Sequence, residues 1–207
     1  MLRLARAVLA IADISGYTHF VHQPDISIVH AEEIITALLE TVIDRAAHPL
    51  TLNKFEGDAA LLYAEFEGPA APVVADILVQ ADAFFAAFAT TRLRLQQDRS
   101  GCGCEACRGI DRLGLKILLH LGDIAIKQIR EHTELAGKPL IVLHRLLKNE
   151  VPGREYLLLT AEFLAPFGSP PAGVAFLQQE IADLEPVRIG YRLESTARAA
   201  ANGPGPG

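Results

Sequence analysis

The sequence has no uncharged apolar run of the roughly 20 residues that a membrane-spanning helix needs. It also has no surplus of basic residues: 19 lysines and arginines stand against 25 aspartates and glutamates, a formal net charge of −6, which argues against a nucleic-acid-binding surface. The opening MLRLARAVLAIAD resembles a signal peptide, but Asp13 interrupts the apolar run and no small-residue cleavage site follows. We therefore expect a cytoplasmic protein without membrane or nucleic-acid partners.

Cysteine is scarce, and Cys102, Cys104 and Cys107 all lie within six positions. An odd, clustered set argues against the disulfide framework of a secreted protein. The CxCxxC spacing offers three soft ligands for Zn²⁺, and the glycines at 101 and 103 would let the loop fold tightly around an ion. Zinc sites usually close with four ligands, so the fourth would be a histidine, a water or a residue of a partner chain. Three reduced thiols in a mobile loop are the alternative.

The length and the hydrophobic content favour one well-buried core, because 50% of the 207 residues are hydrophobic. We predict a single domain over residues 1–195, with the cysteine loop inserted at residues 98–109. Residues 196–207 include ARAAANGPGPG, which has no core-forming residues beyond alanine, and are predicted to be a flexible tail.

Apolar periodicity predicts alternating strands and helices along the chain. Helical spacing occurs from Ile35 to Ile43, from Val74 to about Leu95, and again over residues 139–147. Strands are predicted at residues 7–11, 51–53, 59–66, 115–121, 156–159, 174–177 and 187–193, and residues 124–126 either continue the strand at 115–121 past Gly122 or pair with it. Two successive strand–helix–strand units predict an α+β fold with helices packed on a largely antiparallel sheet. Such a fold would place the strand before Asp13 beside the strand after Asp58.

Two stretches each place an aspartate where an apolar strand meets glycine: Asp13 in IADISGYTHF and Asp58 in NKFEGDAALLYAEF. Most aspartates beside glycine are simply turn residues at strand ends. Two such carboxylates side by side would instead provide the hard oxygen ligands that Mg²⁺ prefers, usually one or two carboxylates together with substrate phosphates.

Three motifs occur in order: Asp13 to Thr18 (DISGYT), Lys54 to Ala59 (KFEGDA) and Leu119 to Gly122 (LHLG). Over roughly residues 7–165 the chain resembles, through these motifs, the catalytic domain of class III adenylate and guanylate cyclases, and three ordered matches are more specific than any one. The resemblance implies the ferredoxin-like nucleotide cyclase fold. The cysteine-rich loop and the segment HRLLKN, from His144 to Asn149, are also similar to an uncharacterised group of bacterial cyclase-like proteins.

The resemblance implies roles for the first two motifs. Asp13, the backbone carbonyl of Ile14 and Asp58 would bind Mg²⁺ or Mn²⁺, with two ions bridging a nucleoside triphosphate and stabilising the attacking and leaving oxygens. Lys54 would contact the purine ring, and a lysine at this position goes with adenine, so ATP is the implied nucleotide. The family's site forms between two chains, which implies a homodimer.

The second half of the implied site departs from the family pattern. Aligning Gly137 with the glycine before the family's NxxxR helix places Glu134 on the base-reading acid, Ile141 on the catalytic asparagine and Arg145 on the transition-state arginine. Glu134 can accept a hydrogen bond from an amino group of the base, and Arg145 keeps the catalytic guanidinium. Ile141 cannot orient a ribose. Asn149, one turn beyond Arg145, is a candidate substitute for the lost amide.

These residues lead to three functional hypotheses. The first is an adenylate cyclase, a phosphorus–oxygen lyase that converts ATP to cyclic AMP and pyrophosphate at a homodimer interface. The alternative is a catalytically impaired cyclase-like module that binds nucleotide or metal for regulation. The third is a metal or redox sensor that uses the cysteine loop.

Overall fold

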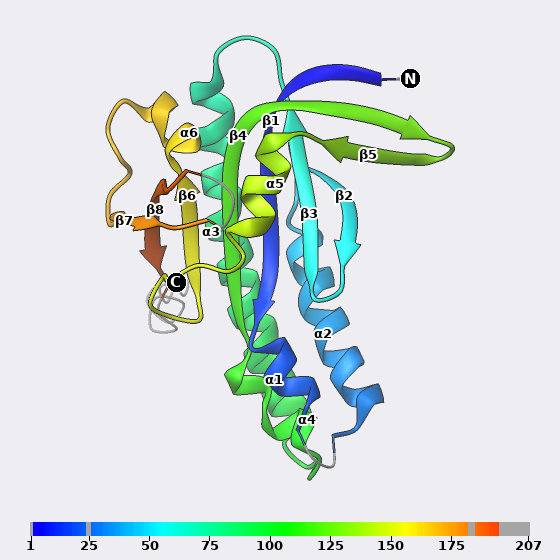
Figure 1. Ribbon diagram of the computed structural model, residues 1–207. Helices are drawn as coiled ribbons and strands as arrows, with labels where there is room; N and C mark the ends of the chain where they lie inside the picture. The colour runs from blue at the N-terminus through cyan, green and yellow to red at the C-terminus, as the bar shows by residue number, and fades with distance from the viewer. Residues whose placement is uncertain (1, 24–25, 182–184, 195–207) are drawn as a thin grey trace, which may run out of the picture.

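The computed structural model describes residues 2–23, 26–181 and 185–194 and shows an α+β fold built on one eight-stranded sheet (Figure 1). Seven strands follow one another in the order β2-β3-β1-β4-β6-β8-β7, and β5 pairs with the far end of β4. Among the strands that the structure describes, β4 and β6 alone pair in parallel. The strands are β1 (Leu2–Ser15), β2 (Thr51–Glu56), β3 (Ala59–Glu65), β4 (Gly114–Ile129), β5 (His132–Ala136), β6 (Tyr156–Thr160), β7 (Ala175–Gln179) and β8 (Val187–Leu193).

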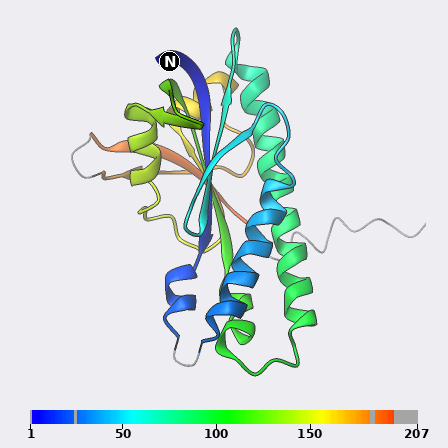
Figure 2. The same ribbon diagram turned by 90° about the vertical axis from the view of Figure 1, so that its right-hand side faces the viewer.

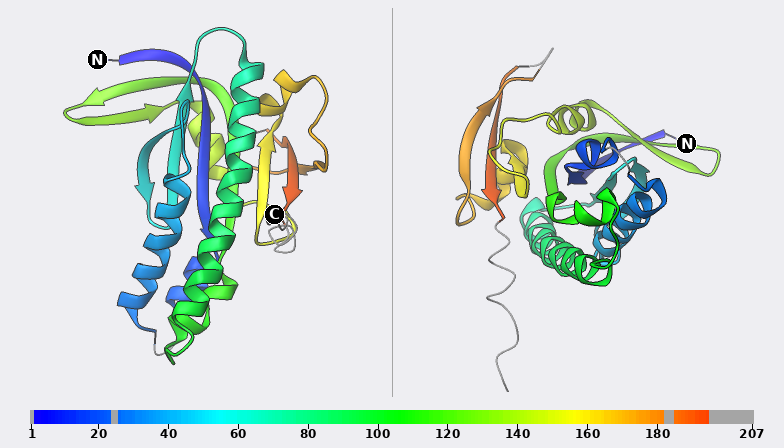
Figure 3. Two further views of the ribbon diagram at one scale, coloured as in Figure 1. Left: turned by 180° about the vertical axis from the view of Figure 1, so that it is seen from behind. Right: turned by 90° about the horizontal axis from the view of Figure 1, so that it is seen from below.

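The two long helices cover one face of the sheet, and a short helix packs on the other (Figure 2). The long pair is α2 (Ile28–Ile43) and α3 (Ala70–Asp98), and the short helix is α5 (Lys138–Arg145). The remaining helical segments are α1 (Tyr17–Val21), α4 (Glu105–Arg108), η1 (Ile110–Arg112), α6 (Ala161–Leu164) and η2 (Ala165–Phe167). Seen from below, α1 and α4 lie at the same end of the molecule as the start of α2 and the end of α3 (Figure 3).

The alternation of side chains along β1 explains why the protein has a core on each side of the sheet. Val8, Ala10, Ala12 and Ile14 belong to the core beneath α2 and α3. Ala7, Leu9 and Ile11 belong to the second core, which includes Val142 and Leu143 of α5. Because Asp13 continues this second set, its side chain is on the α5 face of the sheet.

The predicted fold class is confirmed, and the predicted helices and strands occur with shifted ends. The strand at residues 115–121 was expected to continue past Gly122 or to pair there with residues 124–126, and it continues: β4 runs through Gly122 to Ile129. The structure also contains elements that were not predicted, among them the short helices α1 and α4 and the strand β5, which returns from β4 as an arm at the edge of the sheet (Figure 1). The predicted tail at residues 196–207 lies outside the described residues.

Within the described residues, α3 alone is long and apolar enough to cross a membrane when judged by length and composition. Its buried residues Val74, Ile77, Ala81, Phe84 and Phe88 form part of the core against the sheet. Core helices of globular proteins pass the same test of length and composition.

Candidate metal and nucleotide site

Asp13 and Asp58 are brought together by the antiparallel pairing of β1 with β3. Asp13 pairs with Ala59, the residue that follows Asp58, and the backbone N–H of Ile14 donates to the Asp58 carbonyl at 3.1 Å. Both aspartates therefore lie at one end of adjacent strands, as the sequence predicted. The two motif glycines build this end: Gly57 makes the β2–β3 turn with φ 68°, and Gly16 begins α1 with φ 90°. A side chain at Gly16 would also meet the Arg112 carbonyl at 2.9 Å.

The electrostatics of the two carboxylates differ. Partial burial and then the negative charge of Asp13 raise the pKa of Asp58 to about 6. Asp13 forms an ion pair with Lys116, whose Nζ lies 3.2 Å from its carboxylate, and both side chains are largely buried. Lys116 also opposes the rise in the Asp58 pKa. A divalent cation would relieve the repulsion between the carboxylates, so this donor set fits Mg²⁺ or Mn²⁺.

Lys54 and Glu134 meet although 80 positions separate them in the sequence. The Lys54 Nζ lies 3.6 Å from the Glu134 carboxylate and 3.5 Å from that of Glu56. The side-chain amide of Asn53 donates to the Thr133 carbonyl at 2.8 Å, which fastens β2 to the β4–β5 arm. The structure thus joins the two residues that the cyclase resemblance assigned to base recognition.

The helix α5 carries Ile141 and Arg145 and is held in place at both of its ends. Pro139 packs on the backbone of Gly122, where a Cβ would lie only 2.5 Å from the proline ring. The Nε2 of His144 donates a 2.7 Å hydrogen bond to the carboxylate of Glu56 in β2. Arg145 is in the last turn, and the Ile141 side chain is 54% exposed, so this isoleucine contributes little to the core.

Asn149, proposed above as a substitute amide, is used by the fold. Its Nδ2 donates to the Leu146 carbonyl and to the Tyr156 hydroxyl, each at 2.7 Å, and its Oδ1 accepts from the Val151 N–H at 3.0 Å. These bonds hold the segment between α5 and β6. Because both ends of the Asn149 amide bond within the fold, this side chain does not replace the catalytic asparagine.

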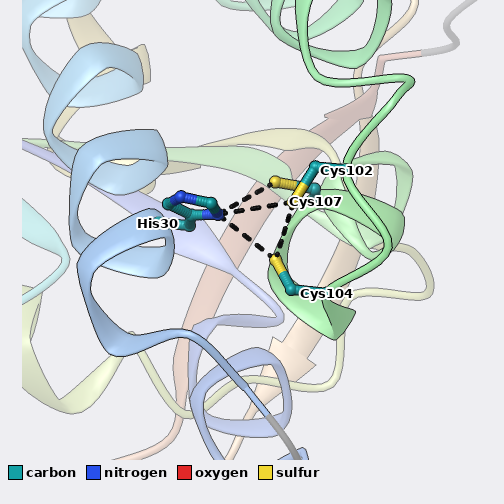
Figure 4. Close-up of side chains that lie close together, drawn as sticks. All are labelled: His30, Cys102, Cys104 and Cys107. Atoms are coloured by element: carbon teal, nitrogen blue, oxygen red, sulfur yellow. Dashed lines mark hydrogen bonds between the residues drawn. The ribbon is translucent and has the colours of Figure 1, made fainter.

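A second cluster lies at the end of the molecule that holds α1 and α4. His30, in the first turn of α2, points its Nδ1 at the sulfurs of Cys102, Cys104 and Cys107 (Figure 4). The four ligand atoms all lie within 4.8 Å of one another, so the group could hold a metal such as zinc.

The thiols of this cluster are unequal. Burial opposes ionisation of Cys104, but hydrogen bonds from the Cys107 backbone, His30 and the other thiols outweigh it and lower the pKa of Cys104 to about 6. Burial and the two neighbouring sulfurs raise the pKa of Cys107 to about 11. One thiolate is thus favoured without a metal, as expected when three sulfurs share a small volume.

Three residues of these sites were missed from the sequence. Lys116 interrupts an otherwise apolar strand, which was the available signal, and Tyr156 lies close enough to Asp13 and Lys116 for their charges to affect its pKa, which burial raises. His30 is 72 residues from Cys102, and no spacing rule connects them. By contrast, His120 is a buried strand residue bonded to the Thr160 hydroxyl at 2.9 Å.

Solved nucleotide cyclases share this fold. The structure superposes on the adenylyl cyclase CyaB from P. aeruginosa with a TM-score of 0.67 and 13% identity, covering 94% of this chain and 97% of that one. The guanylyl cyclase Cya2 gives a TM-score of 0.68 and 14% identity, with 94% of both chains covered. The guanylyl cyclase domain of the RhoGC fusion protein from Blastocladiella emersonii, described as a non-canonical dimer, gives 0.57 and 13%, covering 92% and 95%. The chain therefore has the class III nucleotide cyclase fold.

Sequence comparison gives a nearer relative, the uncharacterized protein Rv2561/Rv2562 of Mycobacterium tuberculosis. It is 41% identical over 123 residues, which are 59% of this chain and 55% of that protein, so the match spans about half of the relative's length. A family model described as a protein of unknown function, DUF2652, matches residues 35–156, from α2 through Cys102 to the start of β6. The chain belongs to the DUF2652 family.

Proposed function

We propose that this chain is an adenylate cyclase-like protein that binds Mg²⁺ or Mn²⁺ with ATP as a homodimer and converts ATP to cyclic AMP and pyrophosphate. The observation that carries the proposal is the placement of Asp13 and Asp58 at the same end of β1 and β3, where burial and the Asp13 charge oppose ionisation of Asp58. Lys116 offsets part of the repulsion between the two carboxylates, and a bound divalent cation would offset more of it.

The residues of this chain fit the implied ions. Asp13 and Asp58 supply hard carboxylate oxygens, and the Ile14 carbonyl is a third oxygen at the same strand end. Divalent ions bound there would neutralise the triphosphate and stabilise the attacking and leaving oxygens. Lys116 supplies the counter-charge for Asp13, with its Nζ 3.2 Å away.

The Lys54–Glu134 pair supports adenine as the base. The Watson–Crick edge of adenine presents a ring nitrogen that accepts a hydrogen bond and an amino group that donates one. Lysine can only donate and a carboxylate can only accept, so the two side chains match that edge. Their 3.6 Å separation lets both reach one base. Guanine presents the reverse pattern at the corresponding ring positions and fits this pair less well.

The guanidinium of Arg145 would stabilise charge on the reacting phosphate. Such a preorganised group contributes about 3 kcal/mol or more to transition-state stabilisation. Arg145 lies on α5, which Pro139 and His144 fix against β4 and β2. The helix α5 therefore holds the Arg145 guanidinium in a fixed position.

One observation favours the alternative of a binding module with impaired turnover. Ile141 occupies the position that the cyclase alignment gives to the catalytic asparagine, and its side chain is 54% exposed without a hydrogen-bonding group. Asn149 is bonded within the fold and does not replace it. We therefore expect slow turnover, because the ribose loses one orienting contact.

The proposal is tested by incubating the purified full-length chain with Mn²⁺ and ATP and measuring cyclic AMP by mass spectrometry. Cyclic AMP should form, and Asp13→Ala and Asp58→Ala should each reduce it at least about 100-fold, because removing a metal ligand weakens all charge stabilisation at the phosphates. Asp76→Ala, at an exposed aspartate in the second turn of α3, is the matched control and should keep the wild-type rate.

Calorimetric titration with Mn²⁺ and ATP separates the two functions. Saturable binding that depends on Asp13 and Asp58, with no cyclic nucleotide from ATP or GTP, would establish the binding module and reject the cyclase. Absence of both binding and product would reject both.

A further inference from the structure

The cysteine loop and helix α2 form a four-donor cluster that the cyclase function does not use. The Nδ1 of His30 lies 3.4 Å from the sulfur of Cys104 and 3.6 Å from the sulfurs of Cys102 and Cys107. The sulfurs of Cys102 and Cys104 are 3.5 Å apart. All three cysteines are free thiols, and the donors come from the first turn of α2, the loop after α3 and α4 (Figure 4).

These distances match the edges of a coordination tetrahedron. Bonds of about 2.3 Å to sulfur and about 2.0–2.1 Å to nitrogen place tetrahedral donors about 3.5–3.8 Å apart. The observed separations of 3.4–3.6 Å are close to these values. An iron–sulfur cluster needs its cysteines spread around several metal and sulfide atoms, and donors that all lie within 4.8 Å of one another leave room for a single ion.

The donor chemistry selects the ion. Three thiolates and one imidazole in a tetrahedral arrangement suit Zn²⁺, whereas Mg²⁺ and Ca²⁺ need oxygen ligands. We propose that His30, Cys102, Cys104 and Cys107 bind one Zn²⁺ ion in a closed structural site. Four protein donors leave no open coordination position for a substrate, which distinguishes this site from a catalytic zinc centre.

The surroundings of the cluster are arranged to support a metal centre. Three thiolates and one Zn²⁺ carry a net charge of −1, and Arg99 interacts electrostatically with Cys107. The same arginine donates to Glu33 of α2 at 2.8 Å, so it joins the end of α3 to α2 beside the cluster. Such outer partners orient the ligands and balance the charge of the centre.

The position of the site indicates what the ion would hold. It would fasten the start of α2 to the loop and to α4, which leads through η1 into β4. In η1 the Arg112 carbonyl packs against Gly16, three residues after Asp13. The ion would therefore stabilise the segment that buttresses the end of β1, and the metal is distinct from the ions proposed at Asp13 and Asp58.

The first test measures metal in the full-length protein, purified under reducing conditions without chelators. Elemental analysis by mass spectrometry should find about one zinc per chain. X-ray absorption spectroscopy at the zinc edge should show three sulfur ligands at about 2.3 Å and one nitrogen ligand at about 2.0–2.1 Å. This measurement needs no variant, so misfolding of a mutant cannot obscure it. Protein without stoichiometric zinc that also fails to take up added Zn²⁺ would overturn the proposal.

The second test assigns the fourth ligand. His30→Ala should lower zinc affinity at least about 10-fold in competition with a chromophoric chelator, since even outer-shell changes cost 10–100-fold. His132→Ala, an exposed histidine at the start of β5, is the matched control and should keep wild-type affinity. Unchanged affinity in His30→Ala, or absorption data showing no nitrogen ligand, would refute this ligand set. Neither measurement uses nucleotide, so the result is independent of cyclase activity.

Discussion

At the scale of single residues, folding opposes the ionisation of Asp58. Its backbone carbonyl helps to join β3 to β1, so the residue cannot move away from Asp13 without losing a sheet hydrogen bond. Its carboxylate is consequently held half-buried beside another acid, and the pKa rises to about 6. Function and stability thus make opposite demands on one side chain, a pattern typical of binding sites.

This conflict predicts a pH-dependent gain in stability for Asp58→Asn in buffers free of divalent ions. In the folded protein the pKa of Asp58 is about 6, above the ordinary value of 3.8. The contribution of Asp58 to the free energy of unfolding therefore falls as the pH rises from about 4 to about 6, and it stays low at higher pH. The pKa difference corresponds to at most about 3 kcal/mol, which partial exposure reduces to about 1 kcal/mol. Urea unfolding should therefore show the variant about 1 kcal/mol more stable at pH 8 and nearly unchanged at pH 4.

Asp76→Asn on the exposed side of α3 serves as the control and should show no such pH dependence. An Asp58→Asn variant with the same relative stability at both pH values would show that Asp58 titrates normally. Added Mn²⁺ should stabilise the wild type and not the variant, because binding to the folded state alone raises stability by mass action.

At the scale of secondary-structure elements, the contact between β4 and α5 determines where Ile141 and Arg145 lie. Gly122 allows the Pro139 ring to approach the strand backbone, and a Cβ there would be 2.5 Å from the ring. Gly122→Ala should cost about 1–3 kcal/mol, because a rigid proline cannot move without shifting the helix. Urea unfolding measures this loss.

The matched control is Gly101→Ala, where a new Cβ would meet nothing within 4 Å. That change should alter the unfolding free energy by no more than about 0.5 kcal/mol. Equal effects of the two substitutions would argue against the proline contact as the reason for the glycine in the LHLG motif.

Local patterns predicted most of these elements, and the exceptions have physical causes. The apolar residues on both sides of Gly122 left two alternatives open, one strand through the glycine or a turn between two strands, because glycine usually weakens strands. The structure shows one continuous strand, in which Pro139 packs against Gly122, and the sequence pattern does not show that tertiary contact. The arm strand β5 has few apolar residues and pairs on the far end of β4. Its sequence therefore carried little periodic signal.

The site residues also divide into those that a local motif predicts and those that only a long-range contact brings into place. Asp13 and Asp58 could be placed together because each ends a strand within a recognisable motif. Three cysteines were recognisable as ligands, whereas His30 joins them only when α2 packs beside the loop that follows α3. Likewise Lys116 faces Asp13 through the β1–β4 register, which side-chain periodicity alone does not specify.

At the scale of the whole molecule, the two proposed metal sites lie in different parts of the fold. Asp13 and Asp58 are at the same end of β1 and β3, and the strand register places Asp13 and Lys54 on the face opposite α2 and α3. The cysteine–histidine cluster combines His30 in the first turn of α2 with cysteines of α4 and of the loop between α3 and α4. The start of α2, the end of α3, α1 and α4 lie at one end of the molecule (Figure 1). The two sites share no ligand, so each can be removed by its own substitutions and its role tested directly.

The cyclase proposal places the two halves of each catalytic site on different chains, and this predicts complementation between inactive variants. Asp13→Ala lacks the metal half and Arg145→Ala lacks the other half, so each homodimer should be nearly inactive. A mixed dimer has one composite site with both defects and one intact site. Random exchange of equal amounts should therefore restore about a quarter of the wild-type cyclic AMP formation per chain.

Mixing Asp13→Ala with Asp58→Ala provides the control, because both substitutions damage the same half and no mixed dimer contains an intact site. Sedimentation of each sample should give a species of twice the 22.4 kDa of one chain, and it verifies that the variants still associate. If dimers exchange subunits while Asp13→Ala and Arg145→Ala recover no activity, the two residues act within one chain. In that case the dimer interface must lie elsewhere than on the sheet face that carries Asp13. An interface on that face would form a composite site only if the partner's arginine reached the triphosphate bound beside Asp13.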